Sequence, residues 1–494
     1  MAQIEFHNLT FAYEGSSGNI FENLNLRLDS RWRLGVVGRN GRGKSTLLGL
    51  LSGRLDSGGA ISGAPDCTCF PPPVDHPQWE TLAVLEELEP QLPLWKIRRE
   101  LSLLEVDEEV LYRPFETLSG GERVKVLLAA LFSGESRFPL IDEPTDHLDL
   151  EGRAVVSRYL KRQAGFVLVS HDRTFLDGCV DHILALERQD VQVRQGDFSA
   201  WWRDREARDA WEAAEQERLK REITRLEGAA RRTATWSDKT EQGKYATKNS
   251  GLRPDRGYVG HKAAKLMKRA KSAQSRREAA VEQASALLKN LEREQPLKLH
   301  PLEHPKRRLV EAEDLTPDYG GGAVCAPVSF TLEQGERLAL VGRNGAGKST
   351  LLKLVCGEDI PHGGVLRLAS GLNVSYVPQD ASGLEGDLSA FAAASGIDET
   401  LFKTILRKLD FSRPQLEKDM GSYSAGQKKK VLLARSLCQS AHLYVWDEPL
   451  NYVDVFSRMQ LEALLRDYPC TLLLVEHDAS FLQAVGARTV ELGR

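Results

Sequence analysis

Residues 36–53 read VVGRNGRGKSTLLGLLSG, and the same pattern returns as LVGRNGAGKSTLLKLVCG at residues 340–357. In each copy, Gly-x4-Gly-Lys-Ser follows a short apolar run typical of a strand and precedes a run typical of a helix. Glycines allow the backbone to curve so that its N–H groups face an anion, and the helix adds the positive end of its dipole. Each copy therefore predicts a phosphate-binding loop between a strand and a helix of an α/β fold.

The residues of these loops suit the phosphates of a nucleotide bound with a metal ion. The lysine would reach the terminal phosphates, and the serine after it would ligate Mg²⁺. We therefore expect ATP and Mg²⁺ as cofactors. The loop residues expected to contact ATP are Gly38, Asn40, Gly41, Gly43, Lys44, Ser45 and Thr46 in the first copy and Gly342, Asn344, Gly345, Gly347, Lys348, Ser349 and Thr350 in the second.

Three further motifs repeat in the same order. They are LSGGERVKVLLA (118–129) with YSAGQKKKVLLA (423–434), LIDEPTDHLD (140–149) with VWDEPLNYVD (445–454), and LVSHDRTFL (168–176) with LVEHDASFL (474–482). All copies lie 304 to 306 positions apart, which indicates a duplicated domain. We expect one domain at 1–200, a linker at 201–300, and a second domain at 301–494.

An acidic pair ends an apolar, strand-like run in each domain. Asp142 and Asp447 would hold Mg²⁺, directly or through water. Glu143 and Glu448 would orient and deprotonate the water that attacks the terminal phosphate. Such a pair can also be an ordinary strand end, but here the two aspartates follow the loop lysines by 98 and 99 residues. The matched distance favours an ATP hydrolase in which these glutamates are catalytic.

The order of phosphate loop, LSGGE, DEPT-x-HLD and SHD resembles the ABC ATPases. The resemblance implies two composite sites, in which the loop of one cassette, at Lys44 or Lys348, faces the signature of the other. The signature begins a helix, and a helix N-terminus suits an anion. The signature residues expected to contact ATP are Ser119, Gly120, Gly121 and Glu122 in the first cassette and Ser424, Ala425, Gly426 and Gln427 in the second.

Two further pairs of residues match positions of the ABC ATPases. His171 and His477 match the switch histidine, which contacts the terminal phosphate. Tyr13 in LTFAYEG and Tyr319 in LTPDYGG match the aromatic that stacks on adenine. A tyrosine of the ordinary core is the alternative interpretation of the second pair.

The two cassettes differ in the residues that are expected to bind Mg²⁺. Gln379 in YVPQD matches the family's glutamine ligand for Mg²⁺, whereas the corresponding place in CFPPPV holds Pro72, which has no side-chain ligand. The second signature, YSAGQ, also departs from LSGGE. Both departures fall on the site around Lys44, so we expect two competent sites with unequal rates.

The linker has its own composition. Residues 201–300 hold 24 Lys and Arg against 15 Asp and Glu, in a chain whose net charge is −4. Two apolar stripes with coiled-coil spacing predict antiparallel helices near 203–232 and 262–294, joined by a tip loop near 233–261. The stripes are Leu219, Ile223 and Leu226, and Val281, Ala284, Leu288 and Leu291.

The positive charge of the linker favours contact with RNA. Lysines along the second helix would follow phosphates, and aromatic residues of the tip would stack on unpaired bases. A solvated hairpin without a partner is the alternative. The residues expected to contact RNA are Trp236, Lys239, Lys244, Tyr245, Lys248, Arg253, Tyr258, Lys262, Lys265, Lys268, Arg269 and Lys271.

Several classes of ABC protein do not fit this sequence. No uninterrupted apolar run reaches membrane-spanning length, and the opening residues carry no secretory signal. The seven scattered cysteines suggest reduced thiols, so we expect a cytoplasmic protein. A chromosome-maintenance ATPase would insert its coiled coil between loop and signature, but here the two lie 75 and 76 residues apart.

A helical linker between two cassettes resembles the ABC-F family of translation factors. IEFHNLTFAYEG, GRNGRGKST, FPPPV and TKNSGLRPDRGYVGHKAAKLMKRAK (247–271) are similar to the Lsa-type antibiotic-resistance branch of that family. The resemblance implies a monomer with paired cassettes whose linker enters the ribosomal E site, near 23S rRNA of the peptidyl-transferase centre and the P-site tRNA. Such proteins protect ribosomes from lincosamides, pleuromutilins and group A streptogramins.

The sequence leaves two other functions open. One is a housekeeping ABC-F translation factor without a resistance role. The other is an ATPase that acts on DNA or on a membrane partner, although the resemblance predicts neither partner.

Overall fold

The computed structural model describes residues 3–13, 18–90, 92–134, 137–187, 191–242, 296–320 and 322–493, with scattered positions from 261 to 281. The chain divides into two compact units, which are Met1–Ser199 with Glu294–Arg494, and Ala200–Arg293. The first unit contains both cassettes, and the second contains the linker.

The main sheet of the first cassette is formed, in spatial order, by β5 (Cys67–Phe70), β6 (Phe138–Asp142), β7 (Phe166–Val169), β3 (Arg33–Gly38), β8 (His182–Leu186) and β9 (Val191–Gln195). Neighbouring strands are parallel except β8 and β9. Parallel strands buried on both faces are continuous apolar runs, as FVLV of β7 illustrates, where every residue is buried. The carboxyl ends of β3, β6 and β7 therefore carry the repeated motifs to one edge.

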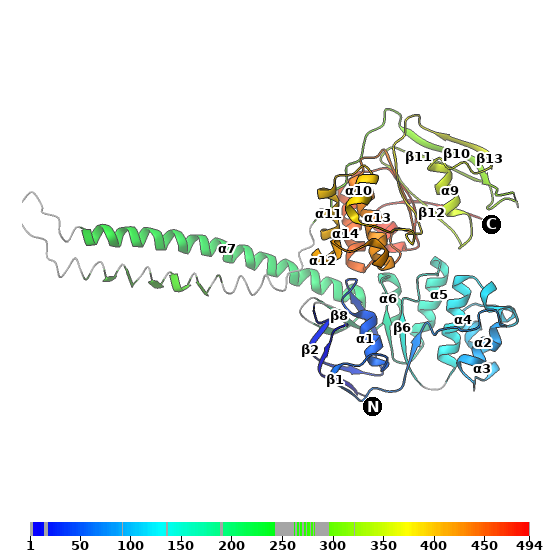
Figure 1. Cartoon of the computed structure of the whole chain (residues 1–494), viewed down its shortest axis with the longest axis horizontal. Helices are drawn as coiled ribbons and strands as arrows, with labels where there is room; N and C mark the ends of the chain where they lie inside the picture. The colour runs from blue at the N-terminus through cyan, green and yellow to red at the C-terminus, as the bar shows by residue number, and fades with distance from the viewer. Residues whose placement is uncertain are drawn as a thin grey trace, which may run out of the picture. The chain divides into compact units, whose positions relative to one another are not determined.

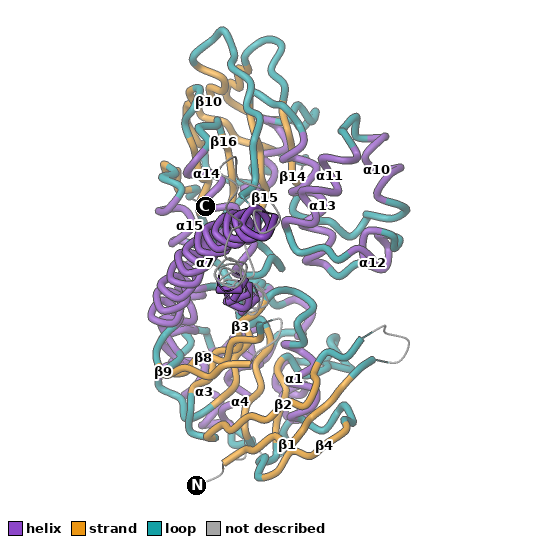
Figure 2. Tube along the Cα trace, turned by 90° about the vertical axis from the view of Figure 1, so that its left-hand side faces the viewer, coloured by secondary structure: helices purple, strands orange, loops and turns teal. Residues whose placement is uncertain are grey.

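A second, antiparallel sheet covers this core. It consists of β2 (Phe21–Asp29), β1 (Gln3–Phe11) and β4 (Gly58–Ser62) (Figure 2). Ile4 and Phe6 of β1 are buried on one face, as the two-residue period of a strand requires. They share one hydrophobic cluster with Val36 of β3 and Leu47 of α1 (Lys44–Leu51). The phosphate loop is thus anchored between two sheets.

The other helices of the first cassette follow the motifs. They are α2 (Thr81–Leu88), α3 (Leu94–Leu103), α4 (Gly120–Ser133), α5 (Leu150–Lys161) and α6 (Arg173–Cys179), with the short 3-10 turns η1 (Glu108–Tyr112) and η2 (Phe115–Thr117). Ser119, Asp149 and Asp172 cap the N-termini of α4, α5 and α6 through their side chains. Each motif therefore ends a strand or loop and starts a helix.

The second cassette repeats this plan. Its five-stranded parallel sheet has the order β14 (Val374–Val377), β15 (Leu443–Asp447), β16 (Leu472–Val475), β12 (Arg337–Val341) and β17 (Arg488–Glu491). Its antiparallel sheet has the order β11 (Val328–Glu333), β10 (Arg308–Pro317) and β13 (His362–Leu368). The helices are α9 (Lys348–Val355), α10 (Leu388–Ala394), α11 (Glu399–Lys408), α12 (Arg413–Leu416), α13 (Ala425–Cys438), α14 (Val455–Asp467) and α15 (Ala479–Ala484), with η3 (Met420–Ser422). The predicted α/β class with a duplicated domain is confirmed.

In the linker unit, α7 (Phe198–Gln242) is one helix of 45 residues (Figure 1). The predicted end at 232 is wrong, because no glycine or proline interrupts the chain between Gly228 and Gly243. Trp236 and Lys239 therefore lie on a helix, not in a tip loop. Leu219 and Leu226 of the predicted apolar stripe are buried.

The returning half of the linker is described only in part. The described positions between 261 and 281 are helical, and Lys265, Lys268 and Lys271 among them are exposed. The predicted stripe residue Val281 is 43% exposed. Of the residues predicted for the tip and the returning half, the following lie outside the described residues, namely Lys244, Tyr245, Lys248, Arg253, Tyr258, Lys262, Arg269, Ala284, Leu288 and Leu291.

The described residues contain neither a membrane-spanning helix nor a cluster of metal-binding side chains. No helix among them is long and apolar enough to cross a membrane. They also contain no group of His, Cys, Asp and Glu side chains arranged for a metal ion. All seven cysteines are free thiols.

Candidate active site

Both phosphate loops close around their lysine. Lys44 Nζ donates to the carbonyl of Gly38 at 2.9 Å, and Lys348 Nζ donates to that of Gly342 at 2.8 Å. Burial lowers the pKa of both ammonium groups. Each loop therefore presents a desolvated positive charge, where a phosphate gains most from it.

The last glycine of each loop is required by its backbone. Gly43 has φ 90° and Gly347 has φ 79°, in the left-handed region that favours glycine. A Cβ atom on Gly43 would also lie 2.5 Å from Ile20 and 2.9 Å from Phe21. The loops thus have the curved backbone that a phosphate cradle needs.

The predicted metal ligands lie together at the ends of β6 and β15. Asp142 lies beside Ser45, and Asp447 beside Ser349. Burial raises the pKa of both aspartates, that of Asp447 to about 6. Oδ1 of Asp447 is buried without a hydrogen-bond partner in the described part of the chain. A buried carboxylate beside a hydroxyl fits Mg²⁺, which prefers such oxygen ligands.

The strand registers support the predicted difference at the third ligand position. Gln379 lies two residues beyond the end of β14, and Pro72 lies two residues beyond the end of β5. Gln379 Nε2 donates to Glu448 Oε2 at 2.9 Å. Pro72 has no side-chain group that could bind a metal ion or donate a hydrogen bond. The first cassette therefore lacks both the amide ligand and the hydrogen bond to its glutamate.

Each candidate catalytic glutamate stands beside its histidine. Glu143 and Glu448 have φ 46° and 45°, and their N–H groups bond to the neighbouring strand. His171 Nε2 lies 3.2 Å from Glu143 Oε1, and His477 Nε2 lies 3.6 Å from Glu448 Oε1. The left-handed turn aims both carboxylates away from the strand, toward the histidine that follows β7 or β16.

The pKa values of the two glutamates shift in opposite directions. Burial, and then the charge of Asp146, raises the pKa of Glu143 well above its usual range. Burial also acts on Glu448, but the interactions with His477 and Gln379 outweigh it and lower the pKa of that carboxyl. The residue that corresponds to Asp146 is Asn451, whose amide donates to Glu448. One substitution between the copies thus replaces a negative charge by a hydrogen-bond donor.

The histidines are buried as well. Burial, and next the charge of Lys44, holds the pKa of His171 well below its usual range. A neutral imidazole there offers one N–H donor and one acceptor, which suits contact with both a carboxylate and a phosphate.

The second signature lies against the first phosphate loop. Asn40 Nδ2 donates to the carbonyl of Tyr452 at 2.9 Å. A Cβ atom on Gly426 would lie 2.6 Å from the same Asn40 amide nitrogen and 2.3 Å from the Tyr452 carbonyl. The predicted neighbourhood of Lys44 and the signature residue Gly426 is thus present, and we call this place site 1.

The reciprocal place, site 2, joins the second loop to the first signature. Asn344 Nδ2 donates to the carbonyl of His147 at 3.0 Å, and a Cβ atom on Gly120 would lie 2.9 Å from His147. A cleft of about 600 Å³ opens beside them. Its lining includes Ser119, Gly121, Glu122, Lys125, Arg343 and Asn344.

Two signature residues that are predicted to contact ATP form hydrogen bonds within their own cassette. Glu122 accepts from the backbone of Ser119, and Gln427 from that of Ser424, in capping boxes at the starts of α4 and α13. Their role toward a nucleotide stays a prediction.

The two tyrosines lie at the edge of the sites. Tyr13 packs edge-on against Phe11, and its hydroxyl is 3.1 Å from Thr46 Oγ1. The side chains of Tyr13 and Tyr319 are 48% and 62% exposed. Neither is a residue of the core, so both rings are accessible to a flat ligand.

Sequence reasoning missed Lys429. Its ammonium is 1% exposed and donates to the carbonyls of Pro378, Gln379 and Asp447, at 2.8, 3.2 and 2.9 Å. Burial lowers the pKa of this lysine to about 8. The first cassette has Val124 at the matching position, so this clamp exists only in the second. A lysine at a buried position of a helix was the signal that could have revealed it.

Comparisons with known proteins agree with this geometry. The sequence profile of the family described as "ABC transporter" matches residues 21–146 and 325–451. The chain is 30% identical to the ribosome protection protein VmlR of Bacillus subtilis over 96% of this chain and 84% of that protein. It is also 30% identical to the ATP-binding protein Uup of Caulobacter vibrioides, over 96% and 74%.

Solved structures share the fold. The RNase-L Inhibitor matches with a TM-score of 0.61 and 21% identity, covering 98% of this chain and 87% of that one. An archaeal ribosome recycling factor, solved in complex with an archaeal ribosomal stalk protein, matches equally well.

Two P-loop ATPase domains with reciprocal signatures define a twin-cassette ABC ATPase, which hydrolyses ATP. Domains of this class generally bind ATP with Mg²⁺. The chain belongs to the ABC-F family, which its similarity to VmlR and Uup along 96% of its length establishes.

Proposed function

We propose that this ABC-F ATPase is a cytoplasmic ribosome-protection factor. It binds the ribosomal E site and relieves inhibition of the peptidyl-transferase centre by lincosamides, pleuromutilins and group A streptogramins, as the Lsa-type resemblance implies. The observation that carries the proposal is the 30% identity to a ribosome protection protein along 96% of the chain.

The roles of the site residues follow from their positions. Lys44 and Lys348 bind the terminal phosphates, and the adjacent signatures close the sites from the opposite cassette. Glu143 and Glu448 accept a proton from the attacking water, and His171 and His477 orient it and the phosphate. Ser45 and Asp142 at site 1, and Ser349, Gln379 and Asp447 at site 2, would hold Mg²⁺, which would supply positive charge to neutralise the phosphates.

ATP times the residence of the protein on the ribosome. Nucleotides sandwiched at sites 1 and 2 hold the cassettes together, and their hydrolysis releases them. The linker contacts 23S rRNA and the P-site tRNA through its basic residues. The exposed Lys265, Lys268 and Lys271 are proposed phosphate contacts, because positive side chains repeated along a helix follow an RNA backbone.

A housekeeping translation role is the second candidate. Its support is the equal identity to Uup, a relative named only as an ATP-binding protein. The two candidates differ in whether the protein changes drug susceptibility.

Expression in a susceptible host separates them. The proposal expects higher inhibitory concentrations of a lincosamide and a pleuromutilin, and no change for the matched Lys44→Ala, Lys348→Ala variant produced at the same level. Unchanged susceptibility with the intact protein contradicts the resistance role.

Ribosome association is measured separately. The Glu143→Gln, Glu448→Gln double variant should co-sediment with ribosomes in ATP, because it closes but does not hydrolyse. Free sedimentation of this variant under those conditions contradicts both ribosomal candidates.

A further inference from the structure

The two histidine segments meet directly. Helices α6 and α15 begin just after His171 and His477, and Asp172 and Asp478 cap them. Between these helices, Thr174 Oγ1 lies 2.6 Å from Ser480 Oγ. The parts of the two cassettes that sense the terminal phosphates therefore touch each other.

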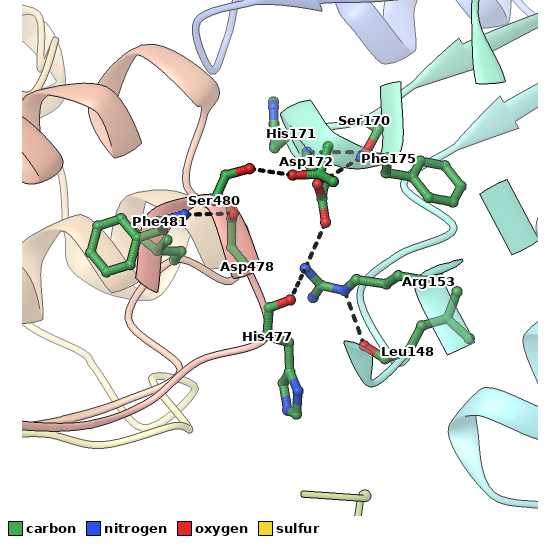
Figure 3. Close-up of polar contacts among 12 residues, drawn as sticks. Leu148, Arg153, Ser170, His171, Asp172, Phe175, His477, Asp478, Ser480 and Phe481 are labelled. Carbon is green, nitrogen blue, oxygen red and sulfur yellow. Dashed lines mark hydrogen bonds and ion pairs between the residues drawn. The ribbon is translucent and has the colours of Figure 1, made fainter. Parts of the chain in front are cut away.

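Arg153 of α5 joins these segments (Figure 3). Its Nη1 donates to Asp172 Oδ2 at 2.8 Å and to the carbonyl of His477 at 3.4 Å, and its Nε donates to the carbonyl of Leu148 at 3.1 Å. The residue is 8% exposed. One buried guanidinium thus contacts the histidine segments of both sites and the loop that lies against the second phosphate loop.

The matching residue of the second cassette makes only part of this set. Arg458 Nε donates to the carbonyl of Val453 at 2.8 Å, as Arg153 does to that of Leu148. Its Nη1, however, lies 3.7 Å from Asp478 Oδ2 and has no hydrogen-bond partner within the described residues. The hydrogen bond to the opposite histidine segment is therefore one-sided, although the charge of Arg458 also acts on Glu143 and His171 of the first cassette.

The hydrogen bonds of Arg153 link the positions of the two histidine segments. Asp172 Oδ1 accepts from the N–H of Phe175 at 2.9 Å and so fixes the start of α6, while its Oδ2 holds Arg153. A guanidinium is planar, so its bonds to Asp172 and to the His477 carbonyl do not move independently. A displacement at His477 is then transmitted to the segment that carries His171.

We propose that Arg153 is a positioning residue that couples the two ATP sites, so that nucleotide at site 1 sets the activity of site 2. The inference rests on the proposed roles of His171 and His477. It predicts that Arg153, which lies outside both phosphate loops, controls communication between the two ATP sites. Arg458 should have no such effect.

The experiment compares site 2 with site 1 either filled or empty. In the Glu143→Gln background, site 1 binds ATP but does not hydrolyse it, and in the Lys44→Ala background it does not bind. The ratio of kcat/KM in these two backgrounds is the coupling factor, which we expect to be about tenfold, within the usual range for coupled sites.

Arg153→Lys keeps the charge but loses the planar fork. We expect it to reduce the coupling factor below about threefold, whereas the control Arg458→Lys leaves the factor intact. An unchanged factor in Arg153→Lys, an equal loss in Arg458→Lys, or a factor of one in the parent overturns the proposal.

Three further variants keep the test decisive. If a thermal unfolding measurement shows that Arg153→Lys is not folded, Asp172→Asn replaces it in the test. Asparagine still caps a helix but no longer attracts the arginine by charge. Its control is Asp478→Asn. If Lys348→Ala in the Glu143→Gln background leaves turnover intact, the assignment of the sites fails, and that result is distinct from a loss of coupling.

Discussion

Sites 1 and 2 are made from the same motifs but present different chemistry. At site 1, Glu143 is buried beside Asp146, and its pKa is raised well above the usual range. At site 2, Glu448 receives hydrogen bonds from Gln379 and Asn451, and its pKa is lowered. The comparison teaches that a repeated motif fixes where a base stands, whereas its neighbours decide the direction in which the pKa of that base shifts.

The largest expected effect is the unequal cost of removing each glutamate. Glu448→Gln should lower ATP turnover at pH 7 by about 100-fold, since it removes the ionised base, whereas Glu143→Gln should lower it less than about threefold. Steady-state phosphate release measures both. Equal losses would show that the two sites contribute alike.

Exchanging one neighbour should make site 1 resemble site 2. In the Glu448→Gln background, Asp146→Asn removes a negative charge beside Glu143 and should raise turnover about fivefold, because less than one pKa unit gives such a change in ionised fraction. The reciprocal Asn451→Asp in the Glu143→Gln background should lower turnover. Effects of the opposite sign contradict this account of the asymmetry.

The two sites should also differ in pH dependence. A base works when it is ionised, so a raised pKa means that activity is lost at a higher pH as the solution is acidified. Between pH 8 and 6, site 1, measured in Glu448→Gln, should lose a larger fraction of its activity than site 2, measured in Glu143→Gln, because the pKa of Glu143 is raised and that of Glu448 is lowered. Superimposable normalised profiles would remove the distinction.

The smallest effect concerns the clamp that only site 2 has. Lys429→Met leaves three buried carbonyls without their donor, which should destabilise the protein by about 1–3 kcal/mol. A calorimetric unfolding midpoint several degrees lower is expected, with a turnover of site 2 reduced about threefold in the Glu143→Gln background. The control is Val124→Met, which changes one apolar side chain for another. A midpoint unaffected by Lys429→Met would mean that water replaces the ammonium.

Much of the fold and of both sites followed from the repeat. Gly43, Lys44 and Asp142 are where the strand-loop-helix pattern predicts them, because backbone curvature and burial leave few alternatives at a phosphate loop. The equivalence of Pro72 and Gln379 was also predictable, since both stand at a fixed distance from a strand.

Other features depend on contacts that no local pattern contains. Arg153 lies outside the four repeated motifs, and the His477 carbonyl to which it donates is 324 positions away in the sequence. The predicted linker helix ends too early. No glycine or proline stands near Trp236 and Lys239, so nothing stops the helix before Gly243.

Because α7 is long and unbroken, a small tilt at one end of this helix produces a large displacement at the other end. At a rise of about 1.5 Å per residue, its 45 residues extend over roughly 70 Å. By the geometry of a rigid rod of that length, a tilt of roughly 5° at one end displaces the other by roughly 6 Å. A rearrangement of less than the width of a side chain near the root of the helix is thereby magnified to the size of a nucleotide base at the far end.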